Sequence, residues 1–495
     1  MVNLPLFIIL PFGVAFFIPM VSRKFKWVPD VLGNITTFIL LLLSLMTLNQ
    51  EHVYHIGGWR APFGIVLVLD GLSCLLLVII NLISFMSSLF SIEYLEKRYT
   101  SKLRYYSLFL LMVGGMNGTV LSGDLFNLFV FMEIASIASY ALVGFGCEAR
   151  ELEASFKYLV MGNVGSLFVL YAVALLYGKT GTLNMADVAR ILKDIPYDNL
   201  IAFSFVLIIS GFMIKSALVP FHAWLPDAHP SAPAPISAML SGVVIKALGV
   251  YVVIRLIFNL FGFNHIISNI LVYMGITSMI IGVCLAILQW DLKRLLAYHS
   301  ISQMGYVFCG IGLGTTLGIL GGIFHLFNHS LFKSLLFLDS GSIEYETETR
   351  DLNKMGLLYK KMPITSFSTL VASMSISGIP PFNGFWSKFI IILASIKAGR
   401  PIVALWAVIG SILTLSSFTK VCRYSIYGKG EKFDKEKWEK LKEVPDFMSI
   451  PLIILSILCI FTGLLLIGLE NGIFGPVIDV LKGGVLEYIN KVLGD

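Results

Sequence analysis

Five ionisable side chains stand deep within long hydrophobic runs of the sequence: Glu133, Lys215, Lys246, His325 and Lys388. If these runs lie in a membrane, each lysine or acidic group costs about 2.5 to 3.5 kcal/mol on insertion scales, so several charges in one apolar chain need a reason. Side chains of these types gain and lose protons, and their placement indicates ion passage. The alternative is that these side chains pair with one another and serve only to hold the structure together.

Two of the lysines are candidate proton carriers. Removal from water disfavours the ammonium form of a lysine, which allows Lys215 and Lys246 to gain and lose a proton near neutral pH. Glu133 is the natural counter-charge, because a carboxylate beside Lys215 holds the lysine protonated and releases the proton when it moves away or is itself protonated. We expect Glu133 and Lys215 to be in contact and to titrate as a pair.

A stripe of titratable groups follows in the second half of the chain. His325 and His329 are four residues apart, and Lys333 continues the same helical face. Unperturbed histidine titrates at about pH 6.5, so the stripe suits a proton relay between the two halves and Lys388. Two alternatives stay open: the histidines could ligate a metal, although no third ligand is evident nearby, or they could pack with satisfied hydrogen bonds.

The composition is that of an integral membrane protein. Of 495 residues, 57% are hydrophobic and 13% are charged, with a mean hydropathy of +0.85, whereas charged residues make up ~25% of an ordinary soluble domain. The six cysteines stand singly, without the spacing of a zinc, haem or iron–sulfur site, and are expected to be packing residues. The sequence contains no Gly-rich nucleotide loop, so energy has to come from outside the chain. The formal net charge of +6 arises in short loops, and nucleic acid is not an expected ligand.

Apolar stretches of about 20 residues, the length that spans a ~30 Å hydrocarbon core, predict fourteen transmembrane helices. They lie near residues 4–21, 31–48, 65–92, 105–122, 125–145, 156–177, 201–220, 234–260, 266–288, 297–315, 318–341, 364–397, 401–427 and 449–470.

The loop charges predict an orientation. Basic residues follow the odd-numbered helices, so the positive-inside rule places these loops in the cytoplasm and both termini outside. An exception is the connection between the sixth and seventh helices, which carries both signs of charge and is expected to lie along the surface. The basic residues after odd-numbered helices are Arg23, Lys24, Lys26, Lys97, Arg98, Lys102, Arg104, Lys293, Arg294, Lys354, Lys360, Lys361 and the lysines between 429 and 442.

Two of the predicted helices contain breaks. One break runs from Ile214 to Pro226 and the other from Ser377 to Lys388, and each contains two prolines. Proline removes a backbone donor and frees a carbonyl, which is tolerable at membrane depth only against protein or a water-filled cavity. A lysine accompanies each break, and interrupted helices in corresponding halves point to a transport site. The alternative is a kink that only serves packing.

The two halves resemble each other weakly at an offset of roughly 170 residues, as internal transporter repeats do. Tyr140 matches Tyr306, and Lys215 falls opposite Lys388. His299 falls opposite Glu133 and becomes a further titratable candidate. Five helices from the fourth onward would form each unit, and an odd number of helices inverts the second copy. The predicted divisions are an N-terminal three-helix segment, 1–104; two five-helix repeats, 105–262 and 263–427; and a cytoplasmic loop, last helix and interfacial tail, 428–495.

The remaining charges suggest structural roles. Asp70 is expected to cap a helix or to form a structural pair, and Asp124 and Asp291 to begin helices, where an anion favours the helix dipole. Arg255 is expected to extend toward a membrane surface. The tail from Val477 to Leu493 is weakly amphipathic and is expected to lie at the interface.

Four motifs, in this order, cover much of the chain. They are LVPFHAWLPDAHPSAP at 218–233, followed by Ile236–Leu240 and Lys246; DLKRLLAY at 291–298; FHLFNH at 324–329, followed by Phe332 and Lys333; and GIPP at 378–381, followed by Ser387 and Lys388. Together they resemble the large antiporter-like membrane subunits, of the D type, shared by respiratory complex I, energy-converting membrane-bound hydrogenases and Mrp cation/proton antiporters.

That resemblance implies an all-α membrane fold of about fourteen helices, with two inverted five-helix repeats, two broken helices and a polar chain across the membrane middle. It implies site roles at matching positions: Glu133 and Lys215 as the first-half pair, Lys246 as the central lysine, His325 and His329 as linking histidines, and Lys388 as the terminal carrier. Some relatives have glutamate at the last position. His299 departs from the small residue expected there.

The leading interpretation is a proton- or sodium-translocating subunit of a redox-driven membrane complex, a membrane-bound hydrogenase or a related ferredoxin-driven complex. The expected partners are homologous antiporter-like subunits, small membrane subunits and lipid in the cell membrane. Nickel–iron and iron–sulfur centres would belong to partner subunits, because this chain is expected to hold no cofactor or metal and to perform no redox chemistry. The alternative is the D-type subunit of a Mrp-type sodium/proton antiporter. A purely structural scaffold would leave the buried charges unexplained.

Overall fold

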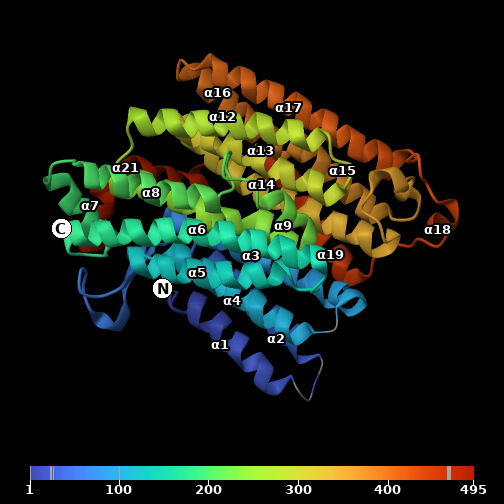
Figure 1. Ribbon diagram of the computed structural model, residues 1–495, viewed down its shortest axis with the longest axis horizontal. Helices are drawn as coiled ribbons and strands as arrows, with labels where there is room; N and C mark the ends of the chain where they lie inside the picture. The colour runs from blue at the N-terminus through green and yellow to red at the C-terminus, as the bar shows by residue number, and fades with distance from the viewer. Residues whose placement is uncertain (1, 23–24, 26, 100, 465–469, 495) are drawn as a thin grey trace.

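The computed structural model describes residues 2–22, 25, 27–99, 101–464 and 470–494. The chain forms a bundle of helices that run side by side along the length of the molecule (Figure 1). In this described part, eight helices are long and apolar enough to cross a membrane. The all-α membrane fold is therefore confirmed, whereas the count of fourteen crossings, the inverted repeats, the orientation and the divisions at 104, 262 and 427 stay predictions. Arg23, Lys24 and Lys26 lie outside the described residues.

The N-terminal region contains a short hairpin as well as helices. Its elements are α1 (Leu6–Val21), α2 (Val28–Met46), β1 (His52–His55), β2 (Val66–Leu69) and α3 (Gly71–Arg98). The strands are antiparallel, with His52 opposite Leu69. The predicted helix at 65–92 was wrong in its first residues, because Asp70 starts α3. The Asp70 carboxylate accepts the Ser73 N–H at 3.0 Å, and Ser73 Oγ accepts the Asp70 N–H at 2.8 Å, a reciprocal cap that fixes the first turn.

The middle of the chain covers the residues predicted from the sequence to form two five-helix units, 105–262 and 263–427. The first comprises α4 (Lys102–Leu121), α5 (Leu125–Val143), α6 (Ala149–Thr180), the short α7 (Met185–Asp194), α8 (Asn199–Lys215), α9 (Leu225–Ser231), and a long segment made of α10 (Ala234–Met239), π turns at Leu240–Val244 and Lys246–Val250, α11 (Tyr251–Leu256) and a π turn at Ile257–Phe261. The second comprises α12 (His265–Ile287), α13 (Leu292–Gly312), α14 (Thr316–Thr347), α15 (Pro363–Ser377), α16 (Asn383–Lys397) and α17 (Pro401–Val421), which continues as a π turn at Cys422–Tyr427. Two 3₁₀ turns, Leu352–Lys354 and Leu358–Lys360, join α14 to α15.

The C-terminal region comprises α18 (Lys435–Glu439), α19 (Asp446–Leu464), a π turn at Glu470–Phe474 and α21 (Gly475–Leu493). In Figure 1, α18 lies at one end of the bundle, and α7 and the C-terminus lie at the other. The amphipathic tail is thus a helix, and α21 packs against α3, α7 and Ile257–Phe261. Its predicted place at the membrane interface stays a prediction.

Both predicted breaks are present. The first broken helix ends at Lys215, where Ala217 adopts a left-handed conformation (φ 53°), and the chain resumes as α9. The second ends at Ser377, where Gly378 is left-handed (φ 81°), and the chain resumes as α16. A left-handed residue after the last turn is a common way to end a helix. The predicted crossing at 364–397 is therefore two shorter helices, whereas the one at 201–220 ends early, at Lys215, and α9 lies beyond its predicted end.

Equivalent positions of the two halves make the same backbone contact. Asp124 bridges to Asn184, and Asp291 bridges to Asp351. The same number of residues separates Asp124 from Asp291 and Asn184 from Asp351. Both Asp124 and Asp291 cap their helices through side-chain hydrogen bonds, as predicted. This shared contact ties the start of α5 to α7 and the start of α13 to the loop after α14.

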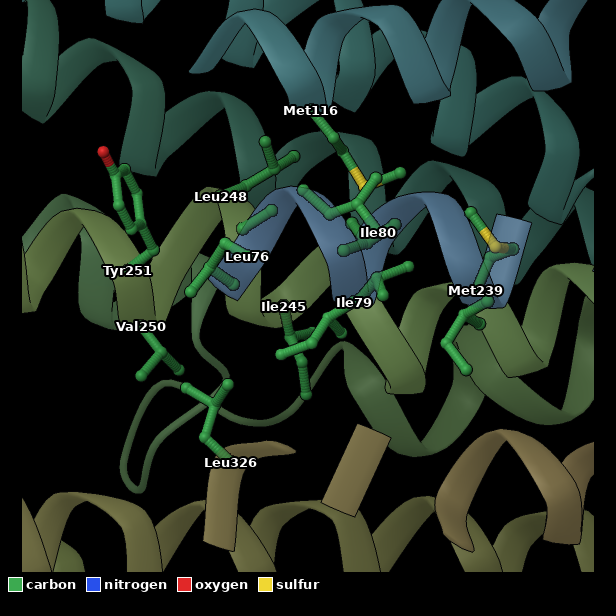
Figure 2. Close-up of a cluster of buried hydrophobic side chains, with 14 of the residues drawn as sticks. Leu76, Ile79, Ile80, Met116, Met239, Ile245, Leu248, Val250, Tyr251 and Leu326 are labelled. Atoms are coloured by element: carbon green, nitrogen blue, oxygen red, sulfur yellow. The ribbon is translucent and has the colours of Figure 1, made fainter. Parts of the chain in front are cut away.

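The segment Ala234–Phe261 lies at the centre of the core, and its residues 234 to 260 are all buried. A helix that is apolar on all sides is typical of such a position. Figure 2 shows its side chains interleaved with those of α3, together with one residue each from α4 and α14; the labelled residues are Leu76, Ile79, Ile80, Met116, Met239, Ile245, Leu248, Val250, Tyr251 and Leu326. This packing fixes the helix that carries Lys246.

Arg255 does not extend toward a surface, so that prediction was wrong. Its guanidinium is 2% exposed and donates to both carboxylate oxygens of Asp70 at 2.7 and 2.8 Å. It also donates to Asn259 Oδ1, and Asn259 in turn donates to the Val480 carbonyl of α21. Because a carboxylate lies within reach inside the bundle, the arginine is satisfied there. The pair therefore joins α3, the central segment and α21.

We expect the Asp70–Arg255 pair to be required for stability. Breaking a buried ion pair leaves one charge uncompensated and costs about 3–5 kcal/mol, so Asp70→Asn and Arg255→Met should each lower the midpoint of thermal unfolding in detergent. The double variant should recover part of the loss, because no unpaired charge remains. The control is Lys440→Met, which removes an exposed pair with Glu436 on α18 and should change stability by less than about 1 kcal/mol. Single variants as stable as the parent would contradict this account.

Candidate functional site

Glu133 and Lys215 are in contact, as the sequence predicts. The Lys215 ammonium lies 3.4 Å from Glu133 Oε1 and also donates to Ser136 Oγ at 3.0 Å and Tyr140 Oη at 3.3 Å. Ser166 on α6 donates to the same carboxylate. The lysine side chain is 4% exposed and that of Glu133 is 20% exposed. Three helices thus hold one carboxylate and one ammonium group where α8 breaks.

Lys246 is fully buried and is bound by backbone carbonyls. Its ammonium group donates to the carbonyls of Ser241 at 2.6 Å and Gly242 at 2.7 Å, which belong to the preceding π turn of its own helix. Among the described residues, no ion pair includes Lys246. A side chain at position 242 would collide with Ser334 Oγ on α14, so glycine lets α14 approach closely. The central lysine therefore has neutral partners that can accept hydrogen bonds but cannot compensate its charge.

The titratable stripe on α14, formed by His325, His329 and Lys333, lies next to Lys246. Lys333 is near enough to Lys246 for their positive charges to repel, and His329 interacts with both lysines. In the part of the chain that the structure describes, Lys333 Nζ and both ring nitrogens of His329 are buried without a hydrogen-bond partner. His325 differs, because Nδ1 lies 2.9 Å from Ser387 Oγ and Nε2 lies 3.2 Å from Gln303 Oε1. Packing with satisfied hydrogen bonds therefore fits His325 and does not fit His329.

Lys388 uses a carbonyl that the second break sets free. It donates to the Ile376 carbonyl at 2.8 Å, and its ammonium group lies 4.7 Å from the ring centroid of Tyr306. At the first break, the Ile214 carbonyl accepts the Ala217 N–H at 3.1 Å and also the Trp224 indole N–H at 3.0 Å. Among the described residues, no carboxylate pairs with Lys388. The two breaks thus place their lysines differently, one against a carboxylate and one against a carbonyl.

His299 does not reproduce the contact of Glu133. Its Nε2 lies 2.8 Å from Ser417 Oγ on α17, and its ring packs against Phe418. The hydrogen bonds of the described residues do not join His299 to Lys388. It therefore stands beside the candidate site, and its titratable role stays a prediction.

His229 on α9 is a buried titratable group that the sequence reasoning missed. Both of its ring nitrogens are buried without a partner in the described part of the chain. Its ring centroid lies 5.6 Å from that of Phe337, and it interacts electrostatically with Lys333 and Lys246. The sequence did offer a reason to consider it, because His229 lies within the motif at 218–233. That motif served only to recognise the family resemblance.

The geometry gives little support to a metal site. Among the described residues, no group of three or more His, Cys, Asp or Glu side chains is placed to hold a metal ion. Four of the cysteines are buried, whereas Cys147 and Cys284 are exposed, so the prediction that all six are packing residues was wrong for these two. What the arrangement offers is a series of buried groups, each able to hold one proton, from Glu133 through Lys215, Lys246, His329, Lys333 and His325 to Lys388.

Comparisons with known proteins decide the family. Residues 122–414 match the family described as NADH:quinone oxidoreductase/Mrp antiporter, TM, and residues 55–106 match the N-terminal family of chain 5 of NADH-ubiquinone oxidoreductase (complex I). The chain belongs to the NADH:quinone oxidoreductase/Mrp antiporter family. The resemblance stated from the four motifs is thereby confirmed.

Members of this family are similar over nearly the full chain. The D subunit of the Na(+)/H(+) antiporter of Alkalihalophilus pseudofirmus is 34% identical, over 91% of this chain and 92% of that protein. A chain of the Mrp complex of Dietzia sp. DQ12-45-1b superposes with a TM-score of 0.91 at 27% identity, and one of an archaeal membrane-bound sulfane sulfur reductase superposes with a TM-score of 0.89 at 31% identity. Each of these two superpositions covers 99% of both chains. The protein is thus an antiporter-like membrane subunit of this family.

Lys246→Met separates a translocating role of the central lysine from a structural one. Methionine matches the length of the side chain and needs no compensation of charge, so we expect the midpoint of thermal unfolding to stay equal or to rise. Proton translocation, measured in vesicles that contain the complete complex, should fall about tenfold or more, because a positioned proton-transferring group typically contributes at least that factor. A stable variant that translocates at the parent rate would remove Lys246 from the site.

Proposed function

We propose that this chain is the D-type subunit of a Mrp-type cation/proton antiporter and that it carries protons along the buried series from Glu133 to Lys388. The single observation that carries the proposal is the contact of Lys215 with Glu133 at the break of α8, at one end of that series. The similarity to the D subunits of Na(+)/H(+) antiporters supports the antiporter interpretation better than the leading redox-driven interpretation from the sequence.

Proton loading starts at the ion pair. Glu133 is the more exposed partner, and Ser166 donates a hydrogen bond to its carboxylate. A cation or a proton that arrives at Glu133 weakens its attraction for the ammonium group. Lys215 then releases its proton toward Lys246, and the two groups titrate as a coupled pair.

Transfer beyond Lys246 depends on groups that lack a fixed partner. Lys246 and Lys333 repel each other when both are charged, so protonation of one favours release from the other. His329 lies among them, and His325 connects onward to Ser387, the neighbour of Lys388. Water molecules that bridge buried polar groups would complete the path. A proton entering at Glu133 can thereby displace one at Lys388.

Glu133→Gln tests the proposal. The amide cannot be charged, so we expect cation-dependent proton exchange, followed with a pH-sensitive dye in inverted membrane vesicles that contain the complete complex, to fall about tenfold or more. Glu133→Asp should keep part of the activity because it keeps the charge. Glu436→Gln on the exposed α18 is the matched control and should exchange like the parent. Parental exchange by Glu133→Gln would refute the proposal.

A subunit of a redox-driven respiratory complex is the second candidate. The observation in its favour is the superposition on the sulfane sulfur reductase chain at 31% identity. In that case, metal centres would reside in companion subunits, and sodium or proton translocation would follow electron transfer. The sites in this chain would serve the same proton movements.

The companions of the native complex distinguish the two candidates. We expect purification of the complex, followed by mass spectrometry and by iron and nickel analysis, to yield only membrane subunits and no stoichiometric metal. Membrane vesicles should then exchange cations for protons when a proton gradient is the sole energy source. Companions that carry iron–sulfur or nickel–iron centres would favour the redox-driven complex and overturn the Mrp assignment.

A further inference from the structure

Asp339 on α14 is a buried carboxyl group that the proposed path does not use. The residue is 1% exposed, and Ser368 on α15 donates a hydrogen bond to its Oδ1. Its Oδ2 is buried without a partner, and no cation pairs with it among the described residues. An unpaired carboxylate in such a place is costly unless it takes up a proton or binds water. Its chemistry therefore suits reversible protonation.

Polar groups connect Asp339 to the end of the molecule that carries α18. Ser368 Oγ also lies 3.0 Å from the Thr365 carbonyl oxygen, and Thr365 Oγ1 donates to Glu443 Oε1 at 2.6 Å. The second oxygen of Glu443 accepts the Ile364 N–H at 2.7 Å. Glu443 is half-buried in the loop between α18 and α19, so it lies at the surface end of this connection. One hydroxyl of α15 thus contacts each carboxyl group, Thr365 that of Glu443 and Ser368 that of Asp339, and a bridging water between the two hydroxyls would complete the connection.

A second set of contacts leads from Asp339 toward the α14 stripe. Cys459 on α19 lies between, since it interacts electrostatically with Asp339 and is near the Ser375 hydroxyl. Ser375 donates to Asn383, whose backbone carbonyl accepts a hydrogen bond from Asn328 at 3.0 Å. On the next turn of α16, Ser387 contacts His325.

Helix geometry places these groups on facing surfaces. On α15, Thr365, Ser368 and Ser375 follow at intervals of three and seven residues, so they share one face. On α14, Asn328 lies three turns before Asp339, which brings both to the face that meets α15 and α16. The Oδ1 atom of Asn328 is a further buried polar atom without a partner in the described part. It offers one of the two or more polar contacts that a bridging water needs.

We propose that Asp339 is a proton-loading group on a second route, which runs from Glu443 along the hydroxyl face of α15 to His325. The inference rests on the proposed function and adds to it an access path from the α18 end that joins the same series at His325 and works in sequence with Glu133 and Lys215, so that exchange requires both. In each transfer the Asp339 carboxylate accepts a proton from the Glu443 side, forms an O–H bond, and gives the proton up toward His325. No other reactant is needed.

Asp339→Asn tests this route in vesicles that contain the complete complex. We expect exchange to fall about tenfold or more, Asp339→Glu to restore part of it, and Ser368→Ala to lower it to a smaller extent. Ser44→Ala on α2 is the matched control for Ser368, because it removes a buried hydroxyl bound to its own helix; it should exchange like the parent. The second readout is the infrared difference spectrum between acidic and alkaline buffer, in which Asp339→Asn should lose one carboxyl band and Ser368→Ala should shift it.

The outcomes separate this inference from the proposed function. Parental exchange or an unchanged carboxyl band in Asp339→Asn overturns the second route, and the antiporter proposal stands if Glu133→Gln is inactive in the same assay. Parental exchange by both variants overturns the antiporter proposal itself. If Asp339→Asn fails to assemble, Ser368→Ala decides: slower exchange with a shifted band supports the route, and an unchanged rate and band overturn it.

Discussion

A charge can persist inside this bundle only where other groups of the same chain take the place of water. The structure meets that requirement in two ways. Arg255, which cannot be deprotonated in a protein, is matched by both oxygens of Asp70, so its charge is permanent and compensated. Lys246 and Lys388 are bound by backbone carbonyls, which accept hydrogen bonds but leave the charge uncompensated. The permanent charge of Arg255 holds helices together, whereas the removable charges of Lys246 and Lys388 are kept apart from carboxylates and that of Lys215 lies beside Glu133.

The interruptions of the helices follow from the same constraint. A break frees carbonyl oxygens that need donors at a depth where water is scarce. At α15 the Lys388 ammonium group is such a donor, and at α8 the Trp224 indole adds to the Ala217 N–H as a donor to the Ile214 carbonyl. Carbonyl oxygens at broken turns and at π turns can thus hold ionisable side chains in the interior, as they do for Lys388 and Lys246. Irregular backbone and buried charge occur together because each satisfies the other.

Part of this arrangement could be read from the sequence because its signals are local. The breaks follow from prolines beside lysines, and the Glu133–Lys215 contact follows from the cost of leaving either charge alone. Partners far apart in the chain could not be read in the same way. Arg255 finds Asp70 across 185 residues, and nothing in the local pattern shows which helices touch. His229 and Asp339 are isolated polar residues in the sequence. Only the packing of the helices shows which groups surround them. The strand at 66–69 is a short apolar run, which has no period that distinguishes it from a helix.

The π turns on either side of Lys246 have a mechanical consequence. A π turn contains one residue more than an α turn, so tightening one of them to α geometry rotates the residues beyond it by about 100° around the helix axis. Because Lys246 begins the second of these turns, a shift that tightened one turn and widened the other would rotate the lysine and leave Arg255 and its contact with Asp70 in register. The apolar packing around Ile245 and Leu248 holds the axis in place. The direction of the central ammonium group would then depend on the hydrogen-bond register of the two turns and would need no displacement of the whole helix.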